Sequence, residues 1–250
     1  MSQKRWDEIY TKTFGGVWYP DEGLVRFVAR FLRRKVGVEA YDDKRPVGRV
    51  LDAGCGNGRH LIFFAEQKFD VYGVDISKEG LRVARAWLRK RGLTAYLQAS
   101  TLTKLPFRPK SFDVVVSCEV LDHMHVRQAI EAMQEFKRVC AKGAYAYVSL
   151  RSTADCEYGR GEKTGRNTFV LEEGYEKGLI QHFYDLEDLS ELLKGFRILD
   201  IESHEKSFPC SFSIDKAFLQ SSQGFRGHVD LANLEPFLKY SRWHIAAEKA

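Results

Sequence analysis

A glycine-rich stretch, LDAGCGNGRH at residues 51–60, is the part of the sequence best suited to hold a ligand. Its glycines stand at alternate positions, namely Gly54, Gly56 and Gly58. Glycines between a strand and a helix let a ligand approach the backbone closely. The stretch differs from the dinucleotide fingerprint G-x-G-x-x-G, because Arg59 stands in place of the last glycine. Asp52, just before the glycines, suits a ligand with a positive amine better than a pyrophosphate.

A second acidic residue, Asp75, ends the next apolar segment at residues 70–75. A carboxylate at the end of a second strand is placed to accept hydrogen bonds from ribose hydroxyls. Taken together with Asp52, it predicts a nucleoside ligand with a zwitterionic tail.

The elements that position these residues alternate along the chain. Strands are expected at residues 49–53, 70–75, 95–98, 111–118, 144–150, 196–203 and 242–249. Helices are expected at residues 60–67, 77–90, 126–140 and 185–193. This alternation predicts an α/β fold built on a parallel sheet with right-handed crossovers.

Three segments fall outside the alternation, at residues 1–47, 151–184 and 204–241. The two inserts adjoin the carboxyl side of the sheet, where open α/β sheets bind ligands. We expect one domain over residues 1–250, with a core at 48–150. The N-terminal segment is expected to form a helical cap, and the inserts a cap that selects the substrate.

Composition limits the class of protein and its compartment. The 250 residues are 44% hydrophobic and 29% charged, which is typical of a globular chain. The N-terminal MSQKRWDEIY has no apolar signal core, and no apolar run approaches the roughly 18 residues of a membrane span. The five scattered cysteines lack CxxC spacing, so we expect a cytoplasmic protein with no metal site. Few asparagines and many Lys, Arg and Glu residues favour a thermophilic source.

Four segments resemble the class I S-adenosylmethionine-dependent methyltransferases. They are VLDAGCGNGRH, VYGVDIS, LTKLPFRPKSFDVVVSCEVLDHM and AYAYVSL. The resemblance covers residues 50–150, and the final strand more loosely. It implies a Rossmann-like, seven-stranded and mostly parallel sheet with helices on both faces. It also implies S-adenosylmethionine as the cofactor and in-line methyl transfer to a nucleophile.

The resemblance assigns parts of the cofactor to individual residues. The methionine part falls to Asp52, Gly54, Cys55, Gly56 and Arg59. The ribose and adenine fall to Asp75, Ile76, Ser100, Thr101 and Leu102. The sulfonium lies near Cys118 and Glu119. Thr101 stands where many relatives have an aspartate, which removes one expected contact with the adenine amine. Tyr10 resembles an N-terminal aromatic residue that closes over the cofactor, or it packs an N-terminal helix.

The methyl acceptor is expected near Asp122, just after the fourth strand. A catalytic base helps only if the acceptor must lose a proton. Asp122 stands where relatives often have a histidine, and it is our candidate catalytic residue. Alternatively, it caps the following helix. His123 is expected to be structural, and weaker candidates for the acceptor pocket are Arg151, Tyr158, His182 and Tyr184.

Two basic segments bear on the identity of the acceptor. Residues 81–110 carry lysines and arginines with no acidic residue, and residues 33–35 are all basic. Such segments favour phosphate binding, so we expect transfer to a nucleobase nitrogen in structured RNA. One alternative is a solvated helix face on an enzyme for a small metabolite, metalloid or lipid precursor. A non-catalytic binding module is the other, and the oligomeric state is left open.

Overall fold

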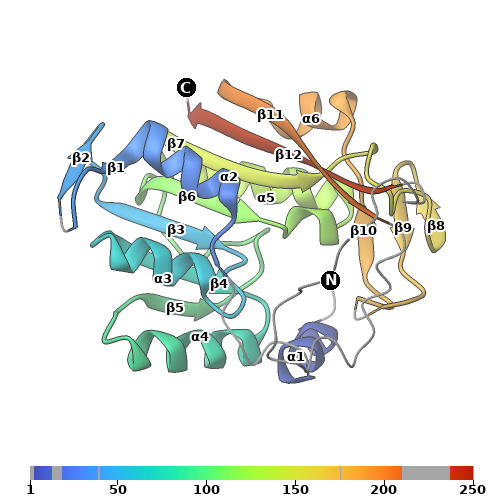
Figure 1. Cartoon of the computed structure of the whole chain (residues 1–250), viewed down its shortest axis with the longest axis horizontal. Coiled ribbons are helices and arrows are strands. Elements are labelled where there is room, and N and C mark those ends of the chain that lie inside the picture. Colours follow the sequence, from blue (N-terminus) through green and yellow to red (C-terminus); the bar gives the residue numbers. More distant parts are fainter. Residues whose placement is uncertain (1–2, 13–18, 39, 175, 210–236, 250) are drawn as a thin grey trace, which may run out of the picture.

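The computed structural model describes residues 3–12, 19–38, 40–174, 176–209 and 237–249. A seven-stranded sheet in the order β11-β12-β7-β6-β3-β4-β5 forms its centre (Figure 1). The strands are β3 (Arg49–Ala53), β4 (Asp70–Asp75), β5 (Tyr96–Ala99), β6 (Phe112–Cys118), β7 (Cys140–Arg151), β11 (Phe196–Pro209) and β12 (Phe237–Lys249). Neighbours pair in parallel, except that β12 is antiparallel to both β7 and β11. The expected Rossmann-like, mostly parallel α/β fold is confirmed.

Helices cover both faces of this sheet. They are α2 (Glu22–Phe27), a π-helix (Val28–Leu32), α3 (Arg59–Glu66), α4 (Lys78–Lys90), α5 (Val126–Val139) and α6 (Leu186–Leu192). Each face of the sheet packs against its own group of helices. Strand β6 contributes to both cores, because successive side chains of a strand point to opposite faces. Val115 belongs to the core under α5 and α6. Val114 and Val116 belong to the core under α2, α3 and α4. Burial on both faces explains why this strand reads as one apolar run.

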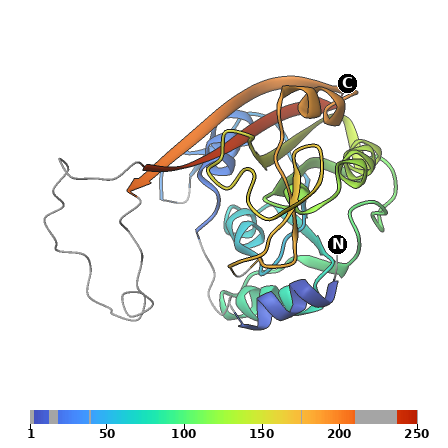
Figure 2. The same cartoon turned by 90° about the vertical axis from the view of Figure 1, so that its right-hand side faces the viewer.

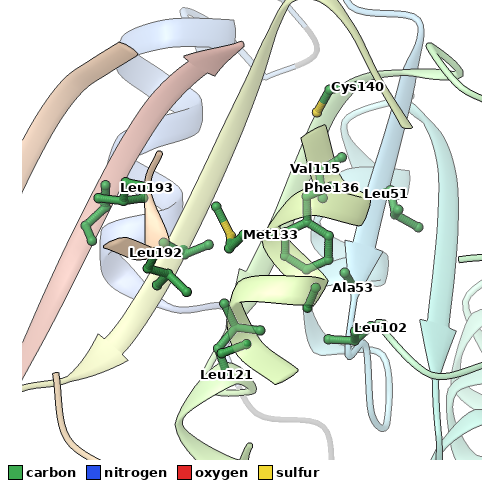
Figure 3. Packing of buried hydrophobic residues seen from close by; sticks show 14 of the residues in the cluster. Leu51, Ala53, Leu102, Val115, Leu121, Met133, Phe136, Cys140, Leu192 and Leu193 are labelled. Atoms are coloured by element: carbon green, nitrogen blue, oxygen red, sulfur yellow. The ribbon is translucent and has the colours of Figure 1, made fainter. Parts of the chain in front are cut away.

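The first of these cores is centred on Phe136 of α5, which packs close to Leu51 and Val115 of the sheet (Figure 3). The Phe136 side chain is fully buried. We therefore expect Phe136→Ala to lower the free energy of unfolding by about 3–5 kcal/mol in denaturant titrations. Leu186→Ala is the matched control, because Leu186 is 68% exposed and should change stability by less than about 0.5 kcal/mol.

The N-terminal segment differs from the helical cap expected at residues 1–47. Helix α1 (Gln3–Lys12) lies against α4, beside the carboxyl ends of the strands (Figures 1 and 2). Helix α2 instead packs on β7 and β12, on one face of the sheet. An antiparallel hairpin of β1 (Arg33–Lys35) and β2 (Tyr41–Asp43) follows it. The segment therefore combines a helix near the site, a sheet-covering helix and a strand pair.

The basic cluster at residues 33–35 forms strand β1, and acidic residues of β2 partly neutralise it. Arg33 pairs with Asp43, and Arg34 lies 3.5 Å from Asp42. Pairing within the hairpin reduces the positive charge that this cluster offers to a phosphate.

The two inserts have different structures. Residues 151–184 hold a three-stranded antiparallel sheet of β8 (Glu162–Gly165), β9 (Thr168–Val170) and β10 (Ile180–His182). In the second insert, residues 204–209 and 237–241 continue β11 and β12 as a paired ribbon that extends away from the sheet (Figure 2). The expected ends of these strands, at 203 and 242, were therefore wrong. The pair of Glu205 with Lys239, at 2.7 Å, joins the two strands of this ribbon. Residues 210–236 of the insert lie outside the described residues.

Candidate cofactor and acceptor site

A cavity of about 440 Å³ opens at the carboxyl ends of β3, β4, β5 and β6. It lies at the topological switch point, because β4 and β5 extend to one side of β3 while β6 and β7 lie on the other. It is lined by nearly all the predicted cofactor residues: Tyr10, Gly54, Cys55, Gly56, Arg59, Asp75, Ile76, Ser100, Thr101, Leu102, Cys118 and Glu119. Asp52 and Asp122 are buried and are not among the described lining residues.

The glycine loop is held open by its backbone conformation. Gly54 and Gly56 have φ values of 87° and 51°, in the left-handed region that favours glycine. A Cβ atom on Gly54 would lie 2.4 Å from the Val120 side chain. On Gly56 it would lie 2.2 Å from the Tyr10 hydroxyl. Larger residues at either position would disturb the wall of the cavity.

Asp75 organises the loop from the end of β4. One carboxylate oxygen accepts a hydrogen bond from the Gly56 N–H at 2.8 Å, and the other accepts from the Ser77 N–H at 2.7 Å. Burial raises the pKa of Asp75 to about 6, although these backbone bonds oppose the shift. The ionised carboxylate therefore joins the glycine loop to the start of α4.

The carboxyl group of Asp52 is buried at the end of β3. It is 1% exposed, and neither oxygen accepts a hydrogen bond from the described residues. Burial raises its pKa to about 8, with Arg59 opposing and Asp75 reinforcing the shift. A buried polar group without a partner calls for an explanation, and a cationic ligand next to this carboxylate would supply one.

Arg59 and Glu119 both line the cavity and form an ion pair, with 2.8 Å between Nη2 and Oε2. Glu119 has a φ of 59°, which is uncommon for a residue other than glycine. Burial acts to raise its pKa, but Arg242 and Arg59 outweigh that effect and lower the pKa to about 2. Glu119 is therefore a carboxylate at neutral pH, in a strained backbone position of the kind found at functional sites.

The two cysteines in the lining are unsuited to nucleophilic attack. Burial raises the pKa of both Cys55 and Cys118 well above the usual range. Since the thiolate is the reactive form, both side chains act as small apolar parts of the wall.

Helix α1 closes one side of the cavity. Asp7 accepts hydrogen bonds from the Ser77 hydroxyl at 2.6 Å and the Glu79 N–H at 3.1 Å, at the first turn of α4. This attachment places Tyr10 beside Gly56, and burial raises the Tyr10 pKa well above its usual value. Two other aromatic residues near the N-terminus could also have closed over the cofactor. Of these, Tyr19 is 93% exposed, and Trp18 lies outside the described residues.

The far end of the cavity is built by elements that are distant in sequence. Its lining there includes Trp6, His123, Met124, Gln128, Arg151, Glu176 and Arg242. Arg151 and Arg242 stand directly opposite each other on the antiparallel strands β7 and β12. Two like charges in this position are unfavourable unless acids compensate them. Arg242 lies 3.1 Å from Asp122, while Arg151 pairs with Glu157.

Asp122, the predicted catalytic residue, is fully buried. One oxygen accepts a hydrogen bond from Arg242, and the other has no partner in the described part of the chain. The alternative role as a helix cap is wrong, because α5 begins at Val126 and His125 occupies the capping position. His123, expected to be structural, lines the cavity.

The weaker predictions for the acceptor pocket gave mixed results. Arg151 lines the cavity, but Tyr158, His182 and Tyr184 are not part of its described lining. Sequence reasoning missed Trp6, His123, Gln128, Glu176 and Arg242. The glycine motif carries no signal for these residues, since the fold alone brings them beside it.

The fold and the cavity are suited to a nucleoside ligand with a charged tail. Residues 50–143 match the model of a family described as the methyltransferase domain. A protein of Encephalitozoon cuniculi, provisionally named a methyltransferase, is 31% identical over 173 residues, which cover 63% of this chain and 74% of that protein. The ubiquinone biosynthesis O-methyltransferase of Aliivibrio fischeri is 31% identical over 102 residues, which cover 40% of this chain and 43% of the enzyme.

A solved structure supports the same fold. The S-adenosylmethionine-dependent methyltransferase of Methanosarcina mazei superposes with a TM-score of 0.63 at 20% identity, covering 94% of this chain and 99% of that one. The chain spans only about two fifths to one half of the length of the ubiquinone O-methyltransferases it matches. It belongs to the class I S-adenosylmethionine-dependent methyltransferase family.

The residues present fit the family's cofactor, S-adenosylmethionine. The Asp52 carboxylate, which has no hydrogen-bonding partner among the described residues, suits a positively charged amine, and the glycine loop leaves the backbone open to a ligand. Asp75 stands at the end of β4, where a ribose would meet it. Among the described residues, no helix is long and apolar enough to cross a membrane.

Proposed function

We propose that this protein transfers a methyl group from S-adenosylmethionine to a small acceptor bound in the same cavity. One observation carries the proposal: the cavity is continuous from the glycine loop and Asp75 to His123 and Arg242. Its volume of about 440 Å³ lies in the range of small-molecule sites. The proposal places the methyl donor and the acceptor side by side in this cavity, so it requires no second binding site.

Each part of the cofactor has residues that would hold it. Asp52 and Arg59 would hold its amine and carboxylate, and Asp75 its ribose. The adenine would pack against Ile76 and the loop of Ser100, Thr101 and Leu102. When bound, the cofactor supplies an electrophilic methyl group on a sulfonium. Glu119 places a negative charge in the same cavity. The chain's main task is to align donor and acceptor, which can lower a barrier by several kcal/mol.

Asp122 is proposed as a positioning residue instead of one that touches the acceptor. Its carboxylate fixes Arg242 from behind the cavity wall at 3.1 Å. It thereby helps to set the charge and shape of the acceptor end without contacting the reacting atoms.

Several features support a small acceptor over RNA. Arg82 pairs with Glu79 at 2.7 Å, and Arg91 pairs with Glu66 at 2.5 Å, so acids outside residues 81–110 partly neutralise this segment. The relatives from Aliivibrio fischeri and Idiomarina loihiensis are named ubiquinone biosynthesis O-methyltransferases. Structured RNA is the second candidate, because Arg89, Lys90 and other basic side chains of this segment are exposed.

Labelling with a methyl-labelled cofactor separates the two acceptors. We expect label in a small-molecule extract and none in unmodified total RNA. The double variant R89E/K90E is the control, and it should label the extract as well as the unaltered protein does. Label in RNA that is lost at high salt and in this variant would overturn the small-acceptor proposal, because phosphate contacts weaken with salt.

A further inference from the structure

His123 lines the acceptor end of the cavity on a turn that is held by hydrogen bonds. It ends the short 3₁₀ turn Leu121–His123 that follows β6, and it is 5% exposed. The turn is fastened on two sides. The Tyr184 hydroxyl donates to the Leu121 carbonyl at 3.0 Å, and Arg242 donates to Asp122 at 3.1 Å. The imidazole is therefore held in a fixed position at the cavity wall.

A hydrogen bond sets the tautomer of this histidine. Nδ1 lies 3.1 Å from the backbone carbonyl of Ile180 in strand β10. A carbonyl oxygen can only accept, so Nδ1 carries the proton. In the neutral ring the lone pair is then on Nε2, which is the nitrogen able to take a proton.

Charged groups from other elements surround the ring. Glu176 of the insert places a carboxylate oxygen 3.6 Å from Nε2, and its other oxygen lies 4.0 Å from Arg151 of β7. The pair of Asp122 and Arg242 lies behind the same turn. An imidazolium formed at His123 would face Glu176 directly, so this carboxylate would stabilise the protonated base. The Ile180 carbonyl orients the ring through Nδ1, and a base oriented by a group on its other nitrogen is a recurring catalytic arrangement.

We propose that Nε2 of His123 is the proton acceptor for a hydroxyl group of the methyl acceptor. This role rests on the proposed function, since a base is needed only where the acceptor loses a proton. The acceptor oxygen forms its bond to the methyl carbon as the carbon–sulfur bond breaks, and that bonding pair stays on sulfur. The hydroxyl proton passes to Nε2. The acceptor proposed here is therefore a hydroxyl compound.

Helix α1 completes the surroundings of this base. The Trp6 ring packs edge-on against the His123 ring, with 5.1 Å between centroids. The same helix is attached to α4 through Asp7 and to the insert through Arg5, whose Nε donates to the Lys177 carbonyl at 3.0 Å. The helix that covers the cofactor loop thus also covers the base and shields it from water.

Nitrogen NMR of histidine tests the tautomer without any acceptor. The protein would be labelled with ¹⁵N-histidine and loaded with S-adenosylhomocysteine, and the His123 signal would be assigned by its loss in His123→Asn. At pH 8 we expect a proton on Nδ1 and none on Nε2. A proton on Nε2, in either the other neutral tautomer or a persistent imidazolium, would overturn the proposal.

Kinetics with catechol as the hydroxyl probe tests the role itself. His123→Asn is the sharpest change, because the Asn amide can still donate to the Ile180 carbonyl but has no basic nitrogen. We expect kcat to fall about a hundredfold or more, the acidic limb of the pH–rate profile to disappear, and cofactor affinity to stay the same. Glu176→Gln should lower kcat less, about tenfold.

His125→Asn is the control, since this histidine is exposed two residues further along. It should leave kcat unchanged. An equal fall of kcat in His123→Asn and His125→Asn, or a loss of cofactor affinity in His123→Asn, would show that His123 is structural. Normal cofactor binding with label appearing only in acceptors that lack a hydroxyl would overturn the base but leave the methyltransferase proposal intact. Failure to bind the cofactor at all would instead contradict the proposed function.

Discussion

Asp75→Ala is expected to lower the affinity for S-adenosylmethionine at least about a hundredfold, or roughly 2.7 kcal/mol. The change removes the acceptor of two backbone hydrogen bonds, from Gly56 and Ser77, as well as the expected partner of the ribose. Each buried N–H left without a partner costs about 1–3 kcal/mol, and the glycine loop loses its side-chain attachment to the end of β4, although the Gly54 and Cys55 N–H groups still donate to the Val74 carbonyl. Isothermal titration calorimetry with the cofactor measures the loss directly.

Asp70→Ala is the matched control for this prediction. Asp70 begins the same strand but is exposed, at 3.5 Å from Arg49, so its removal should leave affinity unchanged. The unaltered protein should also lose affinity as the pH falls through about 6, because burial raises the pKa of Asp75 to about 6 and protonation removes its charge. Affinity in Asp75→Ala within a few-fold of the unaltered protein would show that the cofactor does not use this strand end.

The parts of the site that sequence could predict are those encoded within one strand and its following turn. The Gly54–Gly58 turn and Asp75 each follow a short apolar run, and the strand ends of a parallel sheet meet at one edge. The alternation of β-branched runs with helical periods was enough to predict the central sheet. Local patterns therefore located the cofactor half of the cavity.

The acceptor half depends on contacts that no local pattern records. Arg242 reaches the cavity because β12 inserts antiparallel beside β7, about ninety residues away in the sequence. Asp122 and His123 are neighbours, and the direction of a single 3₁₀ turn decides that the histidine faces the cavity while the aspartate faces inward. The ribbon at the ends of β11 and β12 was missed because it depends on pairing between two segments that are distant in the sequence, including the ion pair of Glu205 with Lys239.

Asp52→Asn is expected to change stability and cofactor affinity in opposite directions. In the free protein none of the described residues donates a hydrogen bond to the Asp52 carboxylate, and burial raises its pKa from the usual 3.8 to about 8. The folded state then binds the proton more tightly than the unfolded state does. The contribution of this group to stability is therefore greatest below pH 4 and is lost as the pH rises to about 8.

Because Asn cannot ionise, the variant escapes this loss while keeping the size of the side chain. At pH 8.5 its midpoint of thermal unfolding should lie several degrees above that of the unaltered protein, and at pH 4 the two should nearly coincide. Cofactor affinity should fall at least about tenfold, since a neutral amide attracts the amine of the cofactor less than a carboxylate does. Calorimetry and thermal unfolding at both pH values measure the two effects, with Asp70→Asn as the control. A variant that is less stable at pH 8.5 would mean that Asp52 already has a partner in the free protein, and its role as the site of the amine would then fail.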